Sequence, residues 1–482
     1  MILSQLLDGI ATPPFDREIA GIACDSRQVE PGFAFVCIDG VAVDGHRFAG
    51  DALQSGAVAL ITQRDLGLPH QIVVENTRKA WAEMAANWFG NPAKRLHMIG
   101  VTGTNGKTSI TYMLKHILEE GGCQVGLIGT IQTLVGSHPL PAVHTTPEAY
   151  ELQGLLAQMV DAGCTHVVME VSSHALAQNR VETIAFDRGI FTNLTQDHLD
   201  YHRTMENYCA AKKKLFENSK LSILNLDDAW EPRIAEGLSC PIVTYSVGND
   251  RADYAAHNVR EKPDGVDFEL VGTGQIGRVK LSIPGLFSVY NALGAAACAL
   301  SLGLPFETVV EALCTMRGVK GRAETVPTGR GFTVVIDYAH TPDGLEKICQ
   351  ALRVGCKGRL VTLFGCGGDR DRAKRPMMGK IAAELSDFLV ITSDNPRSED
   401  PMAIIEDILP GIPKGTPYAV IPYRRDAIAY AIAHAQPEDV ILLAGKGHET
   451  YEVLKTGIYH LDEREVVAET LGLRNKWELG QP

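Results

Sequence analysis

Short apolar runs alternate with helical patterns along most of the chain. In the first part, apolar runs at 33–38, 58–61 and 72–74 predict short strands around one or two helices. A Gly-Asn-Pro tripeptide at 90–92 marks the end of this region. The pattern indicates a small α/β unit over residues 1–90.

The middle region, residues 91–324, continues with strand-then-helix units. An apolar run at 96–101 predicts a buried strand, and a helical pattern follows from Ser109 to Glu120. Further apolar runs predict buried parallel strands at 166–170, 188–193 and 221–225. Residues 249–280 indicate an antiparallel excursion, and residues 291–302 an alanine-rich helix.

The last region, residues 325–482, is a second alternating series. Its four apolar runs predict strands at 333–337, 360–364, 388–392 and 440–444, each ending in a polar loop that contains glycine or proline. Open α/β sheets bind ligands beyond the carboxyl ends of their strands. We therefore expect a ligand site in this region, within an α/β protein of three domains.

The segment 98–109, Met-Ile-Gly-Val-Thr-Gly-Thr-Asn-Gly-Lys-Thr-Ser, has the order of a phosphate-binding loop: strand, glycine-rich turn, helix. Its spacing is a variant, because Val101 stands where the usual pattern has its first glycine. We expect a solvent-facing Lys107 to reach phosphate oxygens and Thr108 to offer its hydroxyl to Mg²⁺. A nucleoside triphosphate is the predicted ligand, held by Gly103, Thr104, Asn105, Gly106, Lys107, Thr108 and Ser109. The alternative is a glycine turn with a solvated lysine.

Single polar residues after other strands are candidates for metal and phosphate binding. Glu170 ends a strand and suits Mg²⁺, although it could be a capping or surface acid. His198 and His202 are four residues apart but lack a zinc-hydrolase pattern, so one histidine near Mg²⁺ is the better interpretation. Arg322 could be a phosphate clamp or a hinge residue. Lys212 belongs to a run of three lysines, which by itself predicts a solvated helix face.

Asp394-Asn395-Pro396-Arg397 follows a predicted strand. A carboxylate, an amide and a guanidinium on one stiff turn can bind both ends of a zwitterionic amino acid. The alternative is an ordinary Asn-Pro turn.

Composition narrows the class of protein. The net charge of −13 argues against a nucleic-acid partner or an acidic membrane. The 11 cysteines form no Cys-x-x-Cys pair, which fits reduced thiols in a cytoplasmic protein. No apolar run approaches the ~20 residues of a membrane span, and the first ten residues lack a signal-peptide pattern. We expect a cytoplasmic monomer.

These segments together resemble the Mur ligases, ATP-dependent enzymes that build the peptide of bacterial cell-wall precursors. The resemblance runs almost end to end. Its motifs are Asp-Ser-Arg (25–27), Gly-Thr-Asn-Gly-Lys-Thr (103–108), His-Thr-Thr-Pro (144–147), Glu-Val-Ser-Ser-His (170–174), Thr-Asn-Leu-x-x-Asp-His-Leu-Asp-Tyr-His (192–202), Tyr-Asn (290–291), Gly-Arg-x-Glu (321–324), Asp-Tyr-Ala-His-Thr-Pro (337–342), Gly-Cys-Gly-Gly-Asp-Arg-Asp (365–371) and Ser-Asp-Asn-Pro-Arg (393–397). The last two point to members that add the third residue of the peptide.

The resemblance implies a UDP-sugar domain over 1–90, a central P-loop-type parallel-sheet ATPase domain over 91–324, and a Rossmann-like amino-acid domain over 325–482. It implies ATP and Mg²⁺ as cofactors, with UDP-N-acetylmuramoyl-L-alanyl-D-glutamate and meso-diaminopimelate as substrates. The implied catalytic residues are Lys107, Glu170, His198 and Lys212. Thr108 and Glu170 would serve one metal and His198 a second, and Lys212 matches a carbamylated lysine that also helps to hold metal.

The remaining implied roles concern binding. Asn291 and Asp337 would lie at adenine and ribose, with Arg322 at the phosphates. Ser26 would contact uridine. The sugar-peptide part would be held by Thr145, Thr146, Ser172, Gln178 and Arg180. The amino acid would be held by Arg370, Asp394, Asn395, Pro396, Arg397, Gly445 and Glu449, with Arg397 selecting diaminopimelate over lysine.

Other functions stay open at this point. They are the same reaction with L-lysine, a folate-polyglutamate ligase, a P-loop NTPase of another class, and an inactive nucleotide-sugar-binding module. A P-loop switch or transporter ATPase would leave the polar loops of the last region unexplained.

Overall fold

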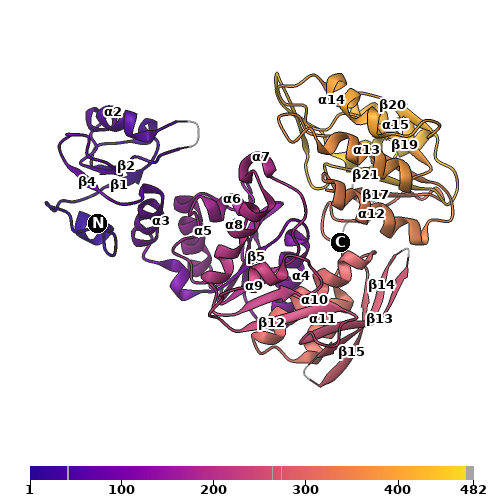
Figure 1. Cartoon of the computed structure of the whole chain (residues 1–482), viewed down its shortest axis with the longest axis horizontal. Helices are drawn as coiled ribbons and strands as arrows, with labels where there is room; N and C mark the ends of the chain where they lie inside the picture. Colours follow the sequence, from indigo (N-terminus) through magenta and orange to yellow (C-terminus); the bar gives the residue numbers. More distant parts are fainter. Residues whose placement is uncertain (41–42, 263, 273, 474–482) are drawn as a thin grey trace.

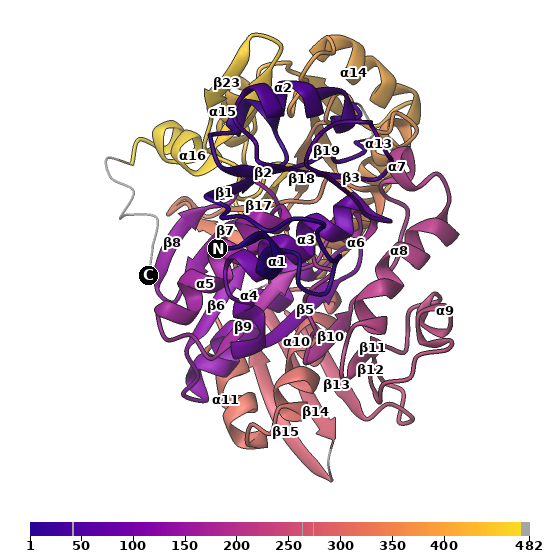
Figure 2. The same ribbon diagram turned by 90° about the vertical axis from the view of Figure 1, so that its left-hand side faces the viewer.

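A computed structural model describes residues 1–40, 43–262, 264–272 and 274–473 (Figure 1). The chain forms three units in sequence order, each built around its own sheet. The N-terminal unit lies at one end and joins the middle unit through α3, which packs against α5 (Figures 1 and 2). Among the described residues, no helix has the length and apolar character needed to cross a bilayer.

The N-terminal unit has a four-stranded parallel sheet in the order β1-β2-β3-β4. Three of these strands were predicted; β1 is only three residues long and too short for a periodicity signal. The elements are α1 (Leu3–Leu6), β1 (Gly21–Ala23), η1 (Ser26–Gln28), β2 (Phe33–Val36), η2 (Gly45–Phe48), α2 (Ala49–Gln54), β3 (Ala59–Thr62), β4 (Gln71–Val73), α3 (Thr77–Trp88) and η3 (Pro92–Arg95).

The middle unit contains an eleven-stranded sheet in the order β15-β14-β13-β12-β11-β10-β5-β9-β6-β7-β8. Strands from β13 to β6 in this order run parallel, as predicted, and both ends of the sheet are antiparallel. The strands are β5 (His97–Thr102), β6 (Val125–Ile128), β7 (Gln132–Val135), β8 (His138–Pro141), β9 (His166–Glu170), β10 (Arg188–Phe191), β11 (Ser222–Asn225), β12 (Ile242–Val247), β13 (Tyr254–Lys262), β14 (Gly265–Gly272) and β15 (Gln275–Leu281).

Helices cover this sheet and bury its apolar residues. The predicted alanine-rich helix is α10, and its small side chains let it pack closely on α4. A β-carbon on Gly294 would lie 3.2 Å from the Ile110 side chain, so glycine is suited to this contact. The helices are α4 (Lys107–Glu120), α5 (Ala149–Asp161), α6 (Ser173–Ala177), α7 (Leu199–His202), α8 (Met205–Glu217), α9 (Glu231–Ala235), α10 (Leu286–Ser301) and α11 (Phe306–Thr315).

The C-terminal unit has a six-stranded sheet in the order β16-β17-β21-β18-β19-β20, parallel except for β16. All four predicted strands of this region are present. The elements are β16 (Glu324–Pro327), β17 (Thr333–Asp337), α12 (Pro342–Gly355), β18 (Leu360–Phe364), α13 (Lys374–Leu385), β19 (Phe388–Ile391), α14 (Pro401–Ile408), η4 (Leu409–Gly411), β20 (Tyr418–Val420), α15 (Arg424–Ala433), β21 (Val440–Ala444), β22 (Tyr451–Leu454), β23 (Gly457–His460) and α16 (Glu463–Leu471). The domain boundaries at 90 and 324 stay predictions.

Candidate active site

The glycine-rich loop joins the end of β5 to the start of α4, and its shape depends on two glycines. Gly103 and Gly106 have φ of +148° and +89°, a region that other residues seldom adopt. A β-carbon on Gly103 would lie 1.8 Å from Thr192 Oγ1, and one on Gly106 would lie 2.4 Å from Asn291 Oδ1. The loop is therefore pressed against β10 and α10, which leaves no space for side chains at these positions.

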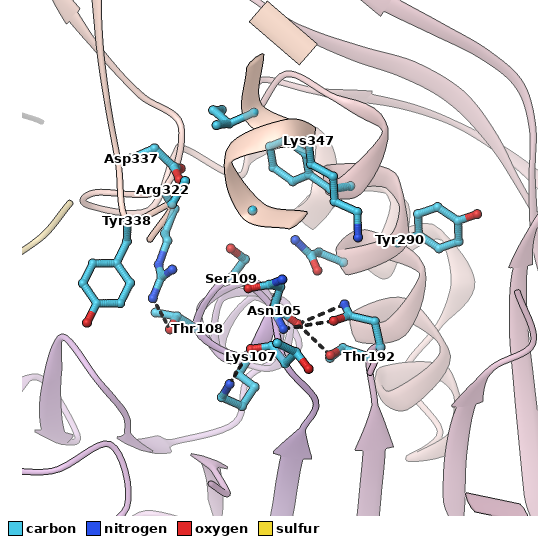
Figure 3. A pocket seen from close by; sticks show the side chains of 18 of the residues that line it. Asn105, Lys107, Thr108, Ser109, Thr192, Tyr290, Arg322, Asp337, Tyr338 and Lys347 are labelled. Carbon is cyan, nitrogen blue, oxygen red and sulfur yellow. Dashed lines mark hydrogen bonds between the residues drawn. The ribbon is translucent and has the colours of Figure 1, made fainter. Parts of the chain in front are cut away.

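The loop is also held by hydrogen bonds from the end of β10 (Figure 3). The Asn105 carbonyl accepts from Thr192 Oγ1 at 2.6 Å, and the Asn105 amide donates to Asn193 Oδ1 at 3.0 Å. The side-chain Nδ2 of Asn105 donates to Oδ2 of Asp343, in α12, at 2.8 Å. The phosphate loop thus contacts the first turn of a helix in the C-terminal unit.

Lys107 is half-buried, so it is less exposed to solvent than predicted. Its ammonium donates to the carbonyls of Gly103 and Thr104 at 3.0 and 2.8 Å, because these loop carbonyls are the acceptors within its reach. Burial lowers the pKa of Lys107, and the neighbouring Glu170 opposes this shift. The group remains beside the loop where phosphate oxygens would lie.

Glu170 is buried at the end of β9, 1% exposed, which eliminates the interpretation as a surface acid. Thr108 Oγ1 donates to Glu170 Oε1 at 2.9 Å, while Thr130 donates to the same carboxylate through its amide and its hydroxyl. Arg322 Nη2 donates to Thr108 Oγ1 at 2.9 Å (Figure 3). A hydroxyl, a carboxylate and a guanidinium therefore meet at the start of α4.

This donor set suits Mg²⁺. Magnesium in nucleotide sites takes one or two carboxylates and completes its octahedron with phosphate and water oxygens. Thr108 and Glu170 supply hard oxygen ligands of that kind. Among the described residues no group of three or more His, Cys, Asp and Glu forms a metal cage, so phosphates would have to share in the coordination.

Lys212 lies on α8 and is buried, 1% exposed, so the prediction of a solvated face is wrong for this lysine. Its Nζ donates to the Gly103 carbonyl at 2.8 Å and lies 4.5 Å from the centre of the Tyr208 ring. The nearby Lys214 is exposed. Burial, and next the charge of Lys107, hold the pKa of Lys212 well below its usual value. Lys212 is therefore the member of the run that can carry chemistry.

The two histidines of the 192–202 segment do not share a regular helix face. His198 has φ of +54° and precedes α7, whereas the buried His202 contacts Ser173 Oγ through Nε2 at 2.9 Å. The His198 ring lies near Asp197, with Nε2 3.5 Å from Oδ2. Burial lowers the pKa of His198 to about 4, although Asp197 opposes the shift. The imidazole is thus neutral near pH 7, as a metal ligand requires.

A cavity of about 620 Å³ lies where these groups meet. Figure 3 shows Arg322, Asp337 and Tyr338 on one side of the loop and Tyr290 on the other. Predicted site residues on its wall are Thr104, Asn105, Gly106, Lys107, Thr108, Ser109, Thr145, Glu170, His198, Asn291, Arg322 and Asp337. Burial raises the pKa of Asp337, whose carboxylate accepts from the Ala323 amide at 2.6 Å. Elements of both the middle and C-terminal units line this cavity.

The residues assigned to the sugar-peptide part gather beside Glu170. Thr146 Oγ1 donates to the Glu170 carbonyl at 2.9 Å and lies 3.3 Å from Ser172 Oγ. Arg180 donates to the Thr146 carbonyl at 3.0 Å and to Gln178 Oε1 at 2.7 Å. Thr145 Oγ1 lies 3.0 Å from Thr130 Oγ1. Ser26 is elsewhere, in η1 of the N-terminal unit.

A second cluster forms at the carboxyl ends of the C-terminal strands. Asp394 and Asn395 are buried, and Asn395 Nδ2 donates to Glu449 Oε2 at 2.8 Å. Gly445, with φ of +115°, approaches so closely that a β-carbon there would lie 2.4 Å from Asp394 Oδ2. An ordinary Asn-Pro turn needs only local contacts, whereas Asp394 and Asn395 also contact residues of a separate loop.

Arg397 lies half-buried at the rim of this cluster, with φ of +53°. Its Nη1 donates to the carbonyls of Gly368 and Asn395 at 2.9 and 3.3 Å. Pro396, just before it, is buried, whereas Arg370 is exposed and donates to the Asp369 carbonyl at 2.9 Å. The predicted amino-acid residues therefore come together, with Arg370 toward solvent.

Sequence reasoning missed several residues of both clusters. Thr130 binds the Glu170 carboxylate, Lys347 lines the cavity, and Lys446 lies among the amino-acid loops. The Gly-Lys-Gly-His-Glu loop after β21 was recognised as polar, but nothing in its sequence distinguished the lysine. Position after a parallel strand was the available signal.

Three models of Mur ligase domains match the chain. They are the Mur ligase family catalytic domain over 18–98, the Mur ligase middle domain over 101–299, and the Mur ligase glutamate ligase domain over 321–447. Two relatives are named UDP-N-acetylmuramoyl-L-alanyl-D-glutamate–2,6-diaminopimelate ligase. That of Caldanaerobacter subterraneus is 48% identical over 99% of this chain and all of its own length; that of Clostridium perfringens is 46% identical, covering 98% and 99%.

Solved structures agree with this relationship. A structure with the same ligase name is 32% identical, with a TM-score of 0.68, and the match covers 94% of this chain and 95% of that one. The MurF ligase of Thermotoga maritima in complex with ADP shares the fold at 18% identity and a TM-score of 0.62, over 93% and 96% of the chains. The three matching domains and the near-complete similarity to these ligases establish that the chain belongs to the Mur ligase family.

Proposed function

We propose that this protein is the ATP-dependent ligase that adds meso-diaminopimelate to UDP-N-acetylmuramoyl-L-alanyl-D-glutamate in peptidoglycan precursor synthesis. The observation that carries the proposal is the 46–48% identity, over nearly the whole chain, to ligases of that name. The phosphate loop with its buried Glu170 and Lys212 supports it, because a protein that only bound a nucleotide sugar would not need these groups.

The reaction has two chemical steps. The γ-carboxylate of the D-glutamyl residue attacks the γ-phosphorus of ATP, so that a C–O–P bond forms and ADP leaves. The amine of the incoming amino acid then attacks the acyl phosphate carbon, loses a proton, and phosphate leaves from the tetrahedral intermediate. Both steps gather negative charge, and preorganised cations at that point lower the barrier.

Residues of this chain would provide that charge. Lys107 and Arg322 lie at the loop where the triphosphate would bind, 2.8 Å and 2.9 Å from the Thr104 carbonyl and Thr108 hydroxyl that they contact. Mg²⁺, held by Thr108 and Glu170, would neutralise phosphate charge. His198 would serve a second metal.

Lys212 is proposed to be carbamylated. Addition of CO₂ requires a neutral amine, and the buried position of Lys212 next to Lys107 favours the neutral form. The carbamate anion would lie near the Gly103 carbonyl and help to hold Mg²⁺.

The other binding roles follow the family pattern. Asn291 and Asp337, both on the cavity wall, would contact adenine and ribose. Ser26 would contact uridine, while Thr145, Thr146, Ser172, Gln178 and Arg180 would hold the sugar-peptide part. We assign UDP-sugar binding to domain 1–90, ATP binding to domain 91–324 and amino-acid binding to domain 325–482. The protein would be a monomer in the cytoplasm.

The identity of the amino acid depends on Arg397. Only diaminopimelate carries a second carboxylate at the end of its side chain, and a guanidinium binds a carboxylate through two parallel hydrogen bonds. Among the described residues, Nε and Nη2 of Arg397 have no hydrogen-bond partner, whereas Nη1 is used by loop carbonyls. Asp394, Asn395, Glu449 and the Gly445 backbone are available for the adjacent ammonium, with Arg370 nearby.

The test is phosphate release with UDP-N-acetylmuramoyl-L-alanyl-D-glutamate and ATP, using diaminopimelate or L-lysine. Because Arg397 is half-buried and keeps solvent contact, we expect a preference in kcat/KM of about 10²-fold or more for diaminopimelate. Arg397→Ala should lose most of this preference. Arg425→Ala, at an exposed arginine on α15, is the control and should keep the preference. Equal kcat/KM for both amino acids with the wild-type protein would contradict the assignment.

A further inference from the structure

Lys446 lies at the centre of the amino-acid loops, although no step described above uses it. Its side chain is 0% exposed. The ammonium donates to Asn395 Oδ1 at 2.9 Å and to the Tyr451 carbonyl at 2.8 Å, and it lies 3.5 Å from Glu449 Oε2. An ammonium has three N–H bonds. All three are directed at groups of the protein, so Lys446 has no donor left for a ligand.

These contacts fix the amide of Asn395. Its Oδ1 accepts from both Lys446 and the Val453 amide, each at 2.9 Å. Two donors on one atom leave the amide a single orientation, in which Nδ2 points to Glu449 at 2.8 Å. Lys446 therefore orders a chain of hydrogen bonds that ends at the Glu449 carboxylate.

Lys446 also compensates two acids that lie close together. Asp394 Oδ1 lies 4.0 Å from its Nζ, and Glu449 Oε2 lies 3.5 Å from it. Other charged or titratable groups facing Lys446 are Glu452 and Glu463, and those facing Glu449 are Arg424, Tyr338 and Tyr451. Burial and the charge of Asp394 raise the pKa of Glu449, and Lys446 opposes that shift.

We propose that Lys446 is a positioning residue, which holds Asn395 and Glu449 as a recognition site for the ammonium group of the incoming amino acid. It acts through these two side chains without touching the substrate. The identity of the ligand rests on the proposed function, whereas the effect of Lys446 on Glu449 does not.

The first experiment measures steady-state kinetics of Lys446→Met. Loss of one hydrogen-bonded charge should raise KM for diaminopimelate roughly 10- to 100-fold, with KM for ATP and for the UDP substrate changed less than about twofold. Lys455→Met, at an exposed lysine on the turn between β22 and β23, should match the wild type. ADP binding by calorimetry shows whether the variant is folded. Unchanged KM for diaminopimelate, or an equal loss for all three substrates, would overturn the proposal.

The second experiment needs no substrate. Carboxyl-¹³C glutamate labelling and a difference spectrum against Glu449→Gln identify the Glu449 signal. Removal of a neighbouring cation disfavours the carboxylate, so Glu449 should titrate at higher pH in Lys446→Met than in the wild type. An identical titration in both would refute the role of Lys446. If the wild type shows no amino-acid-dependent phosphate release, the proposed function is wrong. The titration uses no substrate, so it still tests whether Lys446 acts on Glu449.

Discussion

Two lysines, Lys107 and Lys212, donate to the same backbone carbonyl, that of Gly103. Cations repel each other, so a pair converging at one point inside the protein favours deprotonation of the more deeply buried member. Lys212 is that member, and the charge of Lys107 is among the causes of its lowered pKa. The more strongly lowered pKa of Lys212 favours the neutral amine that carbamylation would require, whereas Lys107 is the proposed cation for phosphate.

For Lys107 we predict that Lys107→Ala lowers ligation by more than ~10²-fold, the scale for removing one group that stabilises developing charge. The lysine is bound only to carbonyls of its own loop, so the fold should survive. Phosphate release checks activity and circular dichroism checks the fold. Lys94→Ala, at an exposed lysine in η3, is the control. Near-normal turnover of Lys107→Ala would disprove the nucleotide site.

For Lys212 we predict that Lys212→Ala is inactive and partly regains activity when a short carboxylic acid is added. The acid would occupy the space of the carbamate and restore its negative charge. Lys214→Ala, at an exposed position on the same helix, should remain active and insensitive to the acid. An active alanine variant at 212, together with electron density for an unmodified lysine, would exclude the carbamate.

Helix α13 carries a residue that links the loops of Arg370 and Arg397 through Glu399. Its Arg375 is completely buried and donates to Glu399 through Nη1 and Nη2 at 3.0 and 2.9 Å, and to Asp407 at 2.8 Å. Glu399 in turn accepts from the Asp369 amide at 2.6 Å. One helix residue thereby keeps two ligand loops in register.

We predict that Arg375→Met destabilises the C-terminal unit by about 3 kcal/mol, because it leaves Glu399 without its buried partner. Arg372→Met is the matched control: Arg372 also pairs with Glu399, but its side chain is 69% exposed, so the change should stay below about 1 kcal/mol. Urea unfolding measures both. Equal effects of the two substitutions would contradict the importance of the buried pair.

The same pair predicts a pH dependence. Hydrogen bonds from Arg375 lower the pKa of Glu399 from 4.5 to about 2. A lowered folded-state pKa stabilises the fold above pH 4.5, and this contribution is lost as pH falls toward 2. Loss of stability over that interval should therefore be steeper in the wild type than in Arg375→Met.

At the scale of the whole molecule, the central cavity is shared between the middle and C-terminal units. Arg322 and Asn105 join them through contacts to Thr108 and Asp343, both side-chain hydrogen bonds of 2.8–2.9 Å. ATP and the amino acid are assigned to different units, so the reaction requires them to approach.

We predict a hinge over residues 322–326, where the chain enters β16. Ala323 there has φ of +48°, an uncommon backbone state. Structures with and without an ATP analogue and the UDP substrate should superpose separately over 93–321 and 327–473, with a rotation between them. Superposition of residues 93–473 as a single rigid body in both states would contradict this prediction.

The sequence alone determined the alternation of strands and helices and the type of site, but it did not predict strands such as β6 (Val125–Ile128) and β12 (Ile242–Val247). Continuous apolar runs such as 166–170 and 440–444 form strands, as predicted. A strand of a parallel sheet is buried on both faces and therefore requires such a run. The phosphate loop was also recognisable, since glycines and a lysine at fixed spacing satisfy a local geometric requirement. The three-residue β1 lay below the length at which a pattern is detectable.

Tertiary structure decided which polar side chains are buried and which residues they contact. Lys212 and Lys214 belong to one lysine run, yet one is buried against the Gly103 carbonyl and the other is exposed. The role of Lys446 depends on the contact of its own loop with Asn395, which lies 51 residues earlier in the chain. Burial and pKa depend on neighbours brought together by folding, and a linear pattern does not contain that information.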